Sequence, residues 1–128
     1  MAGESILIVD HAPVNLKLAD ILLRKEGFTV HAARDAAEAL ALLGGVSPDL
    51  MLVDLRLPGM DALELAHCVK ADPRTRAIPV VVVSASSRVE DVSRARELGA
   101  TEVVSHPVTD ERVLAAVVRA VGGAKAAS

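Results

Sequence analysis

Five short apolar runs recur along the chain, separated by longer segments of mixed character. Three of them, 6–9, 50–53 and 78–83, are continuously apolar rather than alternating. A short continuous apolar run is typical of a strand that is buried on both faces of a sheet. The pattern therefore predicts five strands, over residues 6–9, 28–32, 50–53, 78–83 and 102–105.

The segments between these runs carry helical signals. Apolar residues recur at helical spacing after Pro13, and Gly27 follows them as a stop signal. Asp35 is a plausible N-cap of a second helix, and Thr109 or Asp110 caps the last one. The predicted helices cover 13–26, 35–43, 61–71, 88–98 and a final segment that reaches about Val121.

Strands that alternate with helices of this length predict an α/β fold. The expected architecture is (βα)5, a doubly wound parallel sheet with right-handed crossovers and helices on both faces. We expect the flavodoxin-like strand order 2-1-3-4-5. In such sheets the functional crevice lies beyond the carboxyl ends of the strands. Candidate chemistry is therefore expected just after each apolar run.

The composition fits one compact unit. The 128 residues predict a single domain over 1–121 and a flexible tail over 122–128. Hydrophobic residues make up 52% of the chain and Phe28 is the only aromatic, so the core must be aliphatic. Cys68 is the only cysteine, which excludes an intrachain disulfide.

Charge and hydropathy exclude several function classes. The chain opens without the pattern of a secretory signal peptide, and no apolar run has the length of a membrane-spanning helix. The net charge of −3 gives no electrostatic reason to expect nucleic-acid binding. We therefore expect a cytoplasmic domain that binds neither membranes nor nucleic acids directly.

Polar residues follow four of the five predicted strands. Asp10 and His11 follow the first, Asp54 the third, Ser84 the fourth, and His106 the fifth. Each alone has an ordinary explanation, since Asp10 and Ser84 are also suited to cap helices and His106 to lie in a loop. The expected strand order brings all five to one pocket. Two carboxylates placed side by side repel unless a cation or a proton lies between them, which predicts a metal site or a shifted carboxylate pKa.

Several enzymatic motifs are absent from the sequence. The chain has no GxxxxGK[ST] loop, no GxGxxG after a strand and no GxSxG elbow. Cys68 lies in the middle of a predicted helix, where a small core residue is expected. We therefore do not expect an enzyme such as a small hydrolase.

Four segments give the chain a family resemblance that covers nearly its whole length. It resembles the receiver domains of bacterial two-component response regulators, with matches at ILIVDHAPVNLKLADILL, PDLMLVDLRLPGMDALEL, IPVVVVSAS and ELGATEVVSHPV. The resemblance implies that an aspartate accepts a phosphoryl group from a histidine kinase or phosphotransfer protein, with Mg²⁺. Self-phosphorylation and slow autodephosphorylation are then the most catalysis expected.

The resemblance assigns roles to individual positions. Asp54 matches the phosphoacceptor, and Asp10 matches the first member of the acidic pair that follows the first strand. Ser84 matches the switch hydroxyl. Arg56, two residues after Asp54, would offer its backbone carbonyl to the metal.

Three positions depart from the family pattern. His11 stands where the second acidic residue normally ligates Mg²⁺, His106 replaces the usual lysine, and Val103 replaces the switch aromatic. Mg²⁺ prefers hard oxygen ligands, so its affinity should fall, and the favoured prediction is that His11 leaves the site poor in metal. The alternative is another ion, since Zn²⁺, Mn²⁺ or Ni²⁺ would tolerate a set of Asp10, His11 and Asp54 better. Losing the lysine and the usual metal should slow phosphorylation.

Two functions therefore remain open at this point. The first is a phosphoacceptor with a modified site, which the presence of Asp10, Asp54 and Ser84 favours. The second is a pseudo-receiver, a protein-interaction module that works without phosphorylation, which His11, His106 and Val103 favour. The sequence names neither the kinase nor the output partner, and does not decide between a monomer and a homodimer.

Overall fold

The computed structural model describes residues 3–55, 62–84, 93, 95–97, 99–105 and 108–127. Within these ranges the strands are β1 (Ser5–Val9), β2 (Thr29–Ala33), β3 (Leu50–Asp54), β4 (Val80–Val83) and β5 (Glu102–Val104). The helices are α1 (Pro13–Lys25), α2 (Ala36–Leu43), α3 (Ala62–Ala71) and α5 (Asp110–Ala127). The predicted helix over 88–98 falls largely outside the described residues.

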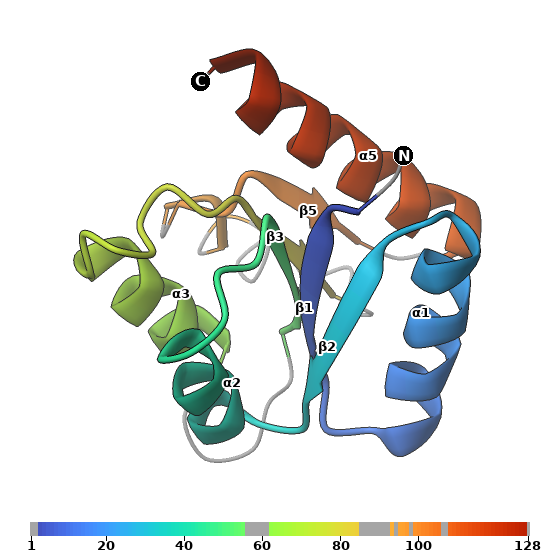
Figure 1. Ribbon diagram of the computed structural model, residues 1–128, viewed down its shortest axis with the longest axis horizontal. Helices are drawn as coiled ribbons and strands as arrows, with labels where there is room; N and C mark the ends of the chain where they lie inside the picture. The colour runs from blue at the N-terminus through green and yellow to red at the C-terminus, as the bar shows by residue number, and fades with distance from the viewer. Residues whose placement is uncertain are drawn as a thin grey trace.

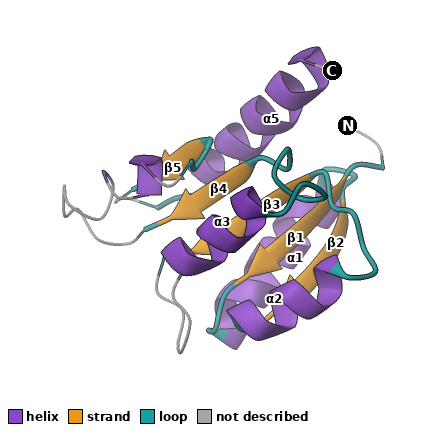
Figure 2. Ribbon diagram, turned by 90° about the vertical axis from the view of Figure 1, so that its left-hand side faces the viewer, coloured by secondary structure: helices purple, strands orange, loops and turns teal. Residues whose placement is uncertain are grey.

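The strands form one parallel sheet with the order β2-β1-β3-β4-β5. This confirms the predicted doubly wound fold. Helices α2 and α3 cover one face of the sheet, and α1 and α5 cover the other (Figure 1). In Figure 2, α2 and α3 lie in front of the strands and α1 lies behind them.

The core consists of two aliphatic clusters, one on each face of the sheet. Within β1, Leu7 and Val9 enter the cluster beneath α2 and α3, whereas Ile6 and Ile8 enter the cluster beneath α1 and α5. This division follows from the pleat, because successive side chains of a strand point to opposite faces. Phe28 belongs to the α1–α5 cluster and is buried. Both faces are thus filled mainly by branched aliphatic side chains together with alanines.

The residues predicted to end α1 and to begin α2 do so in the structure. Gly27 takes a φ of 94°, and the N–H of Phe28 donates to the carbonyl of Leu23, so α1 ends in a left-handed glycine turn. The Asp35 carboxylate accepts from the N–H of Glu38 at 2.8 Å, which confirms Asp35 as the N-cap of α2. Glu38 in turn accepts from the N–H of Arg34 at 2.7 Å.

The last helix is longer than predicted. Helix α5 continues through Gly122 to Ala127, so the expected end near Val121 was wrong. Gly27 and Gly99 take positive φ angles, whereas Gly122 is not among the described glycines that do so. A glycine that keeps helical angles does not stop a helix, and the alanines that follow favour its continuation. The division into a domain over 1–121 and a flexible tail stays a prediction.

Strand β4 starts two residues later than the apolar run predicts. The N–H of Ile78 donates to the carbonyl of Thr75 at 2.9 Å, so Ile78 belongs to the preceding turn, and Pro79 has no N–H to give to the ladder.

Among the described helices, none combines the length and the apolar character that crossing a bilayer demands.

Candidate functional site

The carboxylates of Asp10 and Asp54 lie together because β1 and β3 are parallel neighbours. Val9, the last residue of β1, pairs with Val53, so Asp10 and Asp54 are the next residues at the same edge of the sheet. The Asp54 side chain is 17% exposed. It is therefore held largely by the fold and still reachable from solvent.

Asp10 shapes the turn that leads into α1. Its Oδ1 accepts from the N–H of Ala12 at 2.9 Å. Ala12 itself is the N-cap residue of α1, with no side-chain cap, and Pro13 opens the helix. The alternative role of Asp10 as a helix N-cap is thus wrong, because the chain makes a two-residue turn before the helix starts.

His11 lies beside Asp54. Its Nδ1 is 3.8 Å from Oδ2 of Asp54, and its side chain is 49% exposed. One ligand atom from each of Asp10, His11 and Asp54 falls within 4.8 Å of the others. The structure therefore brings these three predicted site residues together. An exposed imidazole next to a half-buried carboxylate can pair with it or approach an ion beside it.

Ser84 follows β4 at the same edge of the sheet. It is 1% exposed, and its N–H donates to the carbonyl of Val104 on β5 at 2.9 Å. Asp54 pairs with Val83, so Ser84 is one residue beyond the partner of Asp54. Ser84 thus lies at the same edge of the sheet as Asp54 but is not among the residues that line the hollow beside it, and its role at the site stays a prediction.

Arg56 and His106 lie outside the described residues, so their placement in the pocket stays a prediction. Val103 is half-buried on β5 and packs against the cluster beneath α2 and α3. It occupies the expected position of the missing aromatic.

A hollow of about 490 Å³ opens beside the carboxylates, between the sheet, α1 and the start of α5. Asn15 and Asp110 line it together with Asp10, His11 and Asp54. The sequence pattern did not predict Asn15 at this site, and it predicted Asp110 only as a candidate helix cap. Both lie near the start of a helix that follows a strand, and such positions face the carboxyl edge of the sheet, which is the signal that would have found them. The rest of the lining is apolar: Ile8, Val9, Leu18, Ala19, Leu22, Leu52, Val83, Val108 and Val113.

The three donor groups at this edge of the sheet offer both oxygen and nitrogen ligands. Asp10 and Asp54 offer carboxylate oxygens, which suit Mg²⁺, whereas His11 offers an imidazole nitrogen at the third position. Mg²⁺ demands near-octahedral oxygen coordination. The described donor set therefore does not fit an all-oxygen Mg²⁺ site.

The family profile described as "Response regulator receiver domain" matches residues 6–118. This chain belongs to the response regulator receiver family. The match covers all five strands except Ser5 and includes Asp10, His11, Asp54 and Ser84. Receiver domains of this family generally bind Mg²⁺ at an acidic pocket and interact with histidine kinases or phosphotransfer proteins.

Curated relatives agree with this assignment. The receiver domain is 36% identical over 112 residues to "Response regulator PleD" of Caulobacter vibrioides, covering 88% of this chain and 25% of that protein. It is 32% identical over 121 residues to "Polar-differentiation response regulator DivK" of Brucella anthropi, covering 94% of this chain and 98% of DivK. The chain thus spans about a quarter of PleD and nearly all of DivK.

Solved structures share the fold. The signal receiver domain of a histidine kinase from Syntrophus aciditrophicus superposes with a TM-score of 0.86 at 31% identity, over 94% of this chain and 91% of that one. A CheY-like receiver domain protein from Methanospirillum hungatei gives a TM-score of 0.90 at 24% identity, over 99% of this chain and 100% of that one. The second likeness supports the fold alone.

Proposed function

We propose that this receiver domain accepts a phosphoryl group on Asp54 from a histidine kinase or phosphotransfer protein, at a modified site. The observation that carries the proposal is the position of Asp54. It is the last residue of β3, is 17% exposed, and lines the hollow beside Asp10. A phosphodonor can reach such a carboxylate, and the neighbouring strand ends hold it in place.

The chemistry is a transfer between two nucleophiles. A carboxylate oxygen of Asp54 forms a bond to phosphorus while the P–N bond of a phosphohistidine breaks, and the released imidazole nitrogen keeps the electron pair and takes a proton. Asp54 then carries an acyl phosphate. In this proposal Ser84 donates a hydrogen bond to a phosphoryl oxygen, and the imidazoles of His11 and His106 supply positive charge when protonated. The domain catalyses nothing beyond gaining and losing its own phosphoryl group.

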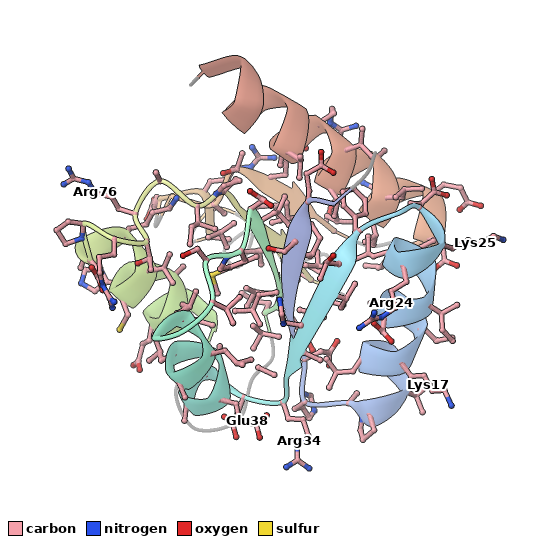
Figure 3. The ribbon with its side chains drawn as sticks, viewed as in Figure 1. Lys17, Arg24, Lys25, Arg34, Glu38 and Arg76 are labelled. Atoms are coloured by element: carbon pink, nitrogen blue, oxygen red, sulfur yellow. The ribbon has the colours of Figure 1, made fainter. Side chains whose placement is uncertain are left out.

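Helix α1 provides a docking surface for the donor next to Asp54. Val14, Leu18 and Ile21 are 68%, 59% and 54% exposed, and their spacing of four and three residues places them on one side of the helix. Leu18 also lines the hollow beside Asp54. Lys17 and Lys25 project outward from the same helix (Figure 3). We propose that the donor meets this stripe with apolar and acidic side chains of its own helix.

The proposal is tested by phosphorylation with a small donor. The domain is incubated with acetyl phosphate or phosphoramidate in the presence of Mg²⁺ or Mn²⁺, and intact-mass spectrometry is used to detect a single phosphoryl adduct. The adduct is expected on the native domain and is expected to be absent from Asp54→Asn. An adduct that persists in Asp54→Asn would place the phosphoryl group on another residue and overturn the proposal.

A second function, the pseudo-receiver, rests on the contact of His11 with Asp54. Nδ1 of His11 lies 3.8 Å from Oδ2 of Asp54, so this side chain can pair with the carboxylate without a metal or a phosphoryl group. In that case the fold serves as an interaction module. Absence of the adduct with either metal, together with its appearance in a His11→Asp, His106→Lys double variant, would favour this second function.

The setting of the domain is also part of the proposal. We propose that it acts in the cytoplasm, in keeping with Cys68, which is a free thiol in the structure. We also propose that the domain acts on an output partner protein, whose type the sequence does not name.

A further inference from the structure

The geometry of the three donors is close to that of ligands around one ion. A small divalent ion with bonds of about 2.0–2.2 Å holds neighbouring ligand atoms roughly 2.8–3.6 Å apart, slightly closer than the donors lie here. Nδ1 of His11 and Oδ2 of Asp54 are already 3.8 Å apart, and the ligand atoms of all three residues fall within 4.8 Å. Small side-chain rotations therefore suffice to bring them onto one ion.

The surroundings permit these rotations. His11 is 49% exposed, so its ring can turn without displacing core side chains. Asp10 is fixed through Oδ1 by the N–H of Ala12 at 2.9 Å. This hydrogen bond orients the Asp10 carboxylate, as outer-shell bonds orient the ligands of metal sites. The carboxylate of Asp10 is thus held in place, whereas the ring of His11 can change its orientation.

The chemistry of the three donor atoms also favours one class of metal ion over another. An imidazole nitrogen beside two carboxylates suits divalent transition ions, whose affinity for nitrogen donors rises from Mn²⁺ towards Ni²⁺ and Cu²⁺, with Zn²⁺ also favourable. Mg²⁺ gains little from nitrogen and gives up its waters reluctantly. Replacing a carboxylate by a neutral imidazole also removes one negative charge from the site, which weakens the attraction of a hard ion further.

We infer that Asp10, His11 and Asp54 form a site that prefers a divalent transition ion over Mg²⁺, with Nδ1 of His11 as a ligand. The inference rests on the proposed function only for the location of the site, because it concerns the unphosphorylated domain. In such a site His11 does not merely weaken the metal centre of a receiver domain. It changes which ion the centre selects.

The test measures binding by the untagged, unphosphorylated domain, with Co²⁺ and Zn²⁺ as transition-ion probes and Mg²⁺ as the competitor. Calorimetry gives the affinities, the visible absorption of Co²⁺ reports a nitrogen ligand, and the imidazole ¹⁵N resonances identify which histidine shifts with Zn²⁺. We expect one Co²⁺ site that an excess of Mg²⁺ does not empty, and a Zn²⁺-dependent shift of the His11 Nδ1 resonance.

Two variants make the test specific. His11→Asp is expected to weaken Co²⁺ relative to Mg²⁺ by about tenfold or more, because it restores an all-oxygen donor set. His67→Asp makes the same change at an exposed position of α3 and is the matched control, expected to leave both affinities unchanged. Equal preference for the two ions in the native domain, or the same response from both variants, would overturn the inference.

The outcomes separate this inference from the proposed function. A selective Co²⁺ site together with no phosphoryl adduct would leave the inference standing and remove the phosphoacceptor function. An Asp54 adduct formed with Mg²⁺ alone, together with no Co²⁺ binding, would do the reverse.

Discussion

The imidazole of His11 alters the electrostatics that a phosphoryl group meets at Asp54. A receiver site with three carboxylates attracts a hard cation, and the cation offsets the charge of the incoming phosphoryl group. Here one of those carboxylates is replaced by a side chain that is neutral or positive, 3.8 Å from Asp54. Under the proposed function, this single position is expected to affect both the ion that binds and the rate of phosphoryl transfer.

A prediction at this scale concerns the rate of phosphorylation with Mg²⁺. His11→Asp should raise the initial rate of adduct formation from acetyl phosphate by roughly tenfold, because it restores an oxygen ligand. Time-resolved intact-mass spectrometry measures the rate, with His67→Asp as the control for the change of charge. An unchanged rate in His11→Asp would show that His11 does not limit phosphorylation.

At the scale of elements, α1 joins the site to the surface proposed for the donor. The turn at Asp10 leads directly into the helix, and Leu18 faces the hollow next to Asp54. The exposed apolar side chains of Val14, Leu18 and Ile21 do not belong to the packed core, since they lie outside both core clusters. A partner that covers them would lie beside the hollow that Leu18 and Asp54 both line.

A prediction for α1 separates docking from chemistry. Ile21→Glu, at an exposed position of the same stripe that does not line the hollow, should slow phosphoryl transfer from a cognate phosphotransfer protein by about tenfold, because a charge would enter an apolar contact. Phosphorylation by acetyl phosphate should be unaffected, because a small donor needs no docking surface. The matched control is Val118→Glu, which changes an exposed valine on α5. An equal loss with both donors would indicate damage to the site itself.

The N-cap of α2 gives a prediction about stability. Removing the Asp35 carboxylate leaves the N–H of Glu38 without its acceptor at the start of the helix. Asp35→Ala should therefore lower the free energy of unfolding by about 1 kcal/mol, measured by urea titration. Asp35→Asn, which keeps an acceptor oxygen, should recover most of this loss.

At the scale of the whole molecule, the sheet separates two clusters that contribute differently to function. The α1–α5 layer adjoins the hollow and the carboxylates, whereas the α2–α3 layer, which includes Leu65 and Val69, lies on the opposite face. Substitutions of Leu65 or Val69, neither of which lines the hollow, should therefore act through global stability and leave the surface of the site intact.

A pair of leucine variants tests this division. Leu65 is fully buried in the α2–α3 layer and Leu18 is 59% exposed. Leu65→Ala should lower the free energy of unfolding by about 2–5 kcal/mol, because it removes buried methyl groups and leaves a cavity. Leu18→Ala should change it by less than about 0.5 kcal/mol. Similar losses from both variants in urea titrations would contradict the burial seen here.

The fold and the central site residues were predictable for the same reason. Continuous apolar runs identify buried parallel strands, and parallel strands bring their carboxyl ends to one edge, so Asp10, His11 and Asp54 had to meet. The length of α5 was not predictable, because Gly122 either stops a helix or continues it depending on its backbone angles. The lining role of Asn15 was missed because side-chain directions on a helix depend on how the helix packs.

The burial of Phe28 as the single aromatic ring has a practical consequence for spectroscopy. The chain has no tryptophan and no tyrosine, so the domain is nearly transparent and non-fluorescent where indole and phenol absorb. One tryptophan introduced at Val103, half-buried on β5, would report its own surroundings without any background signal. Because the core is aliphatic, the fluorescence of a single introduced tryptophan would be measured without background from other residues.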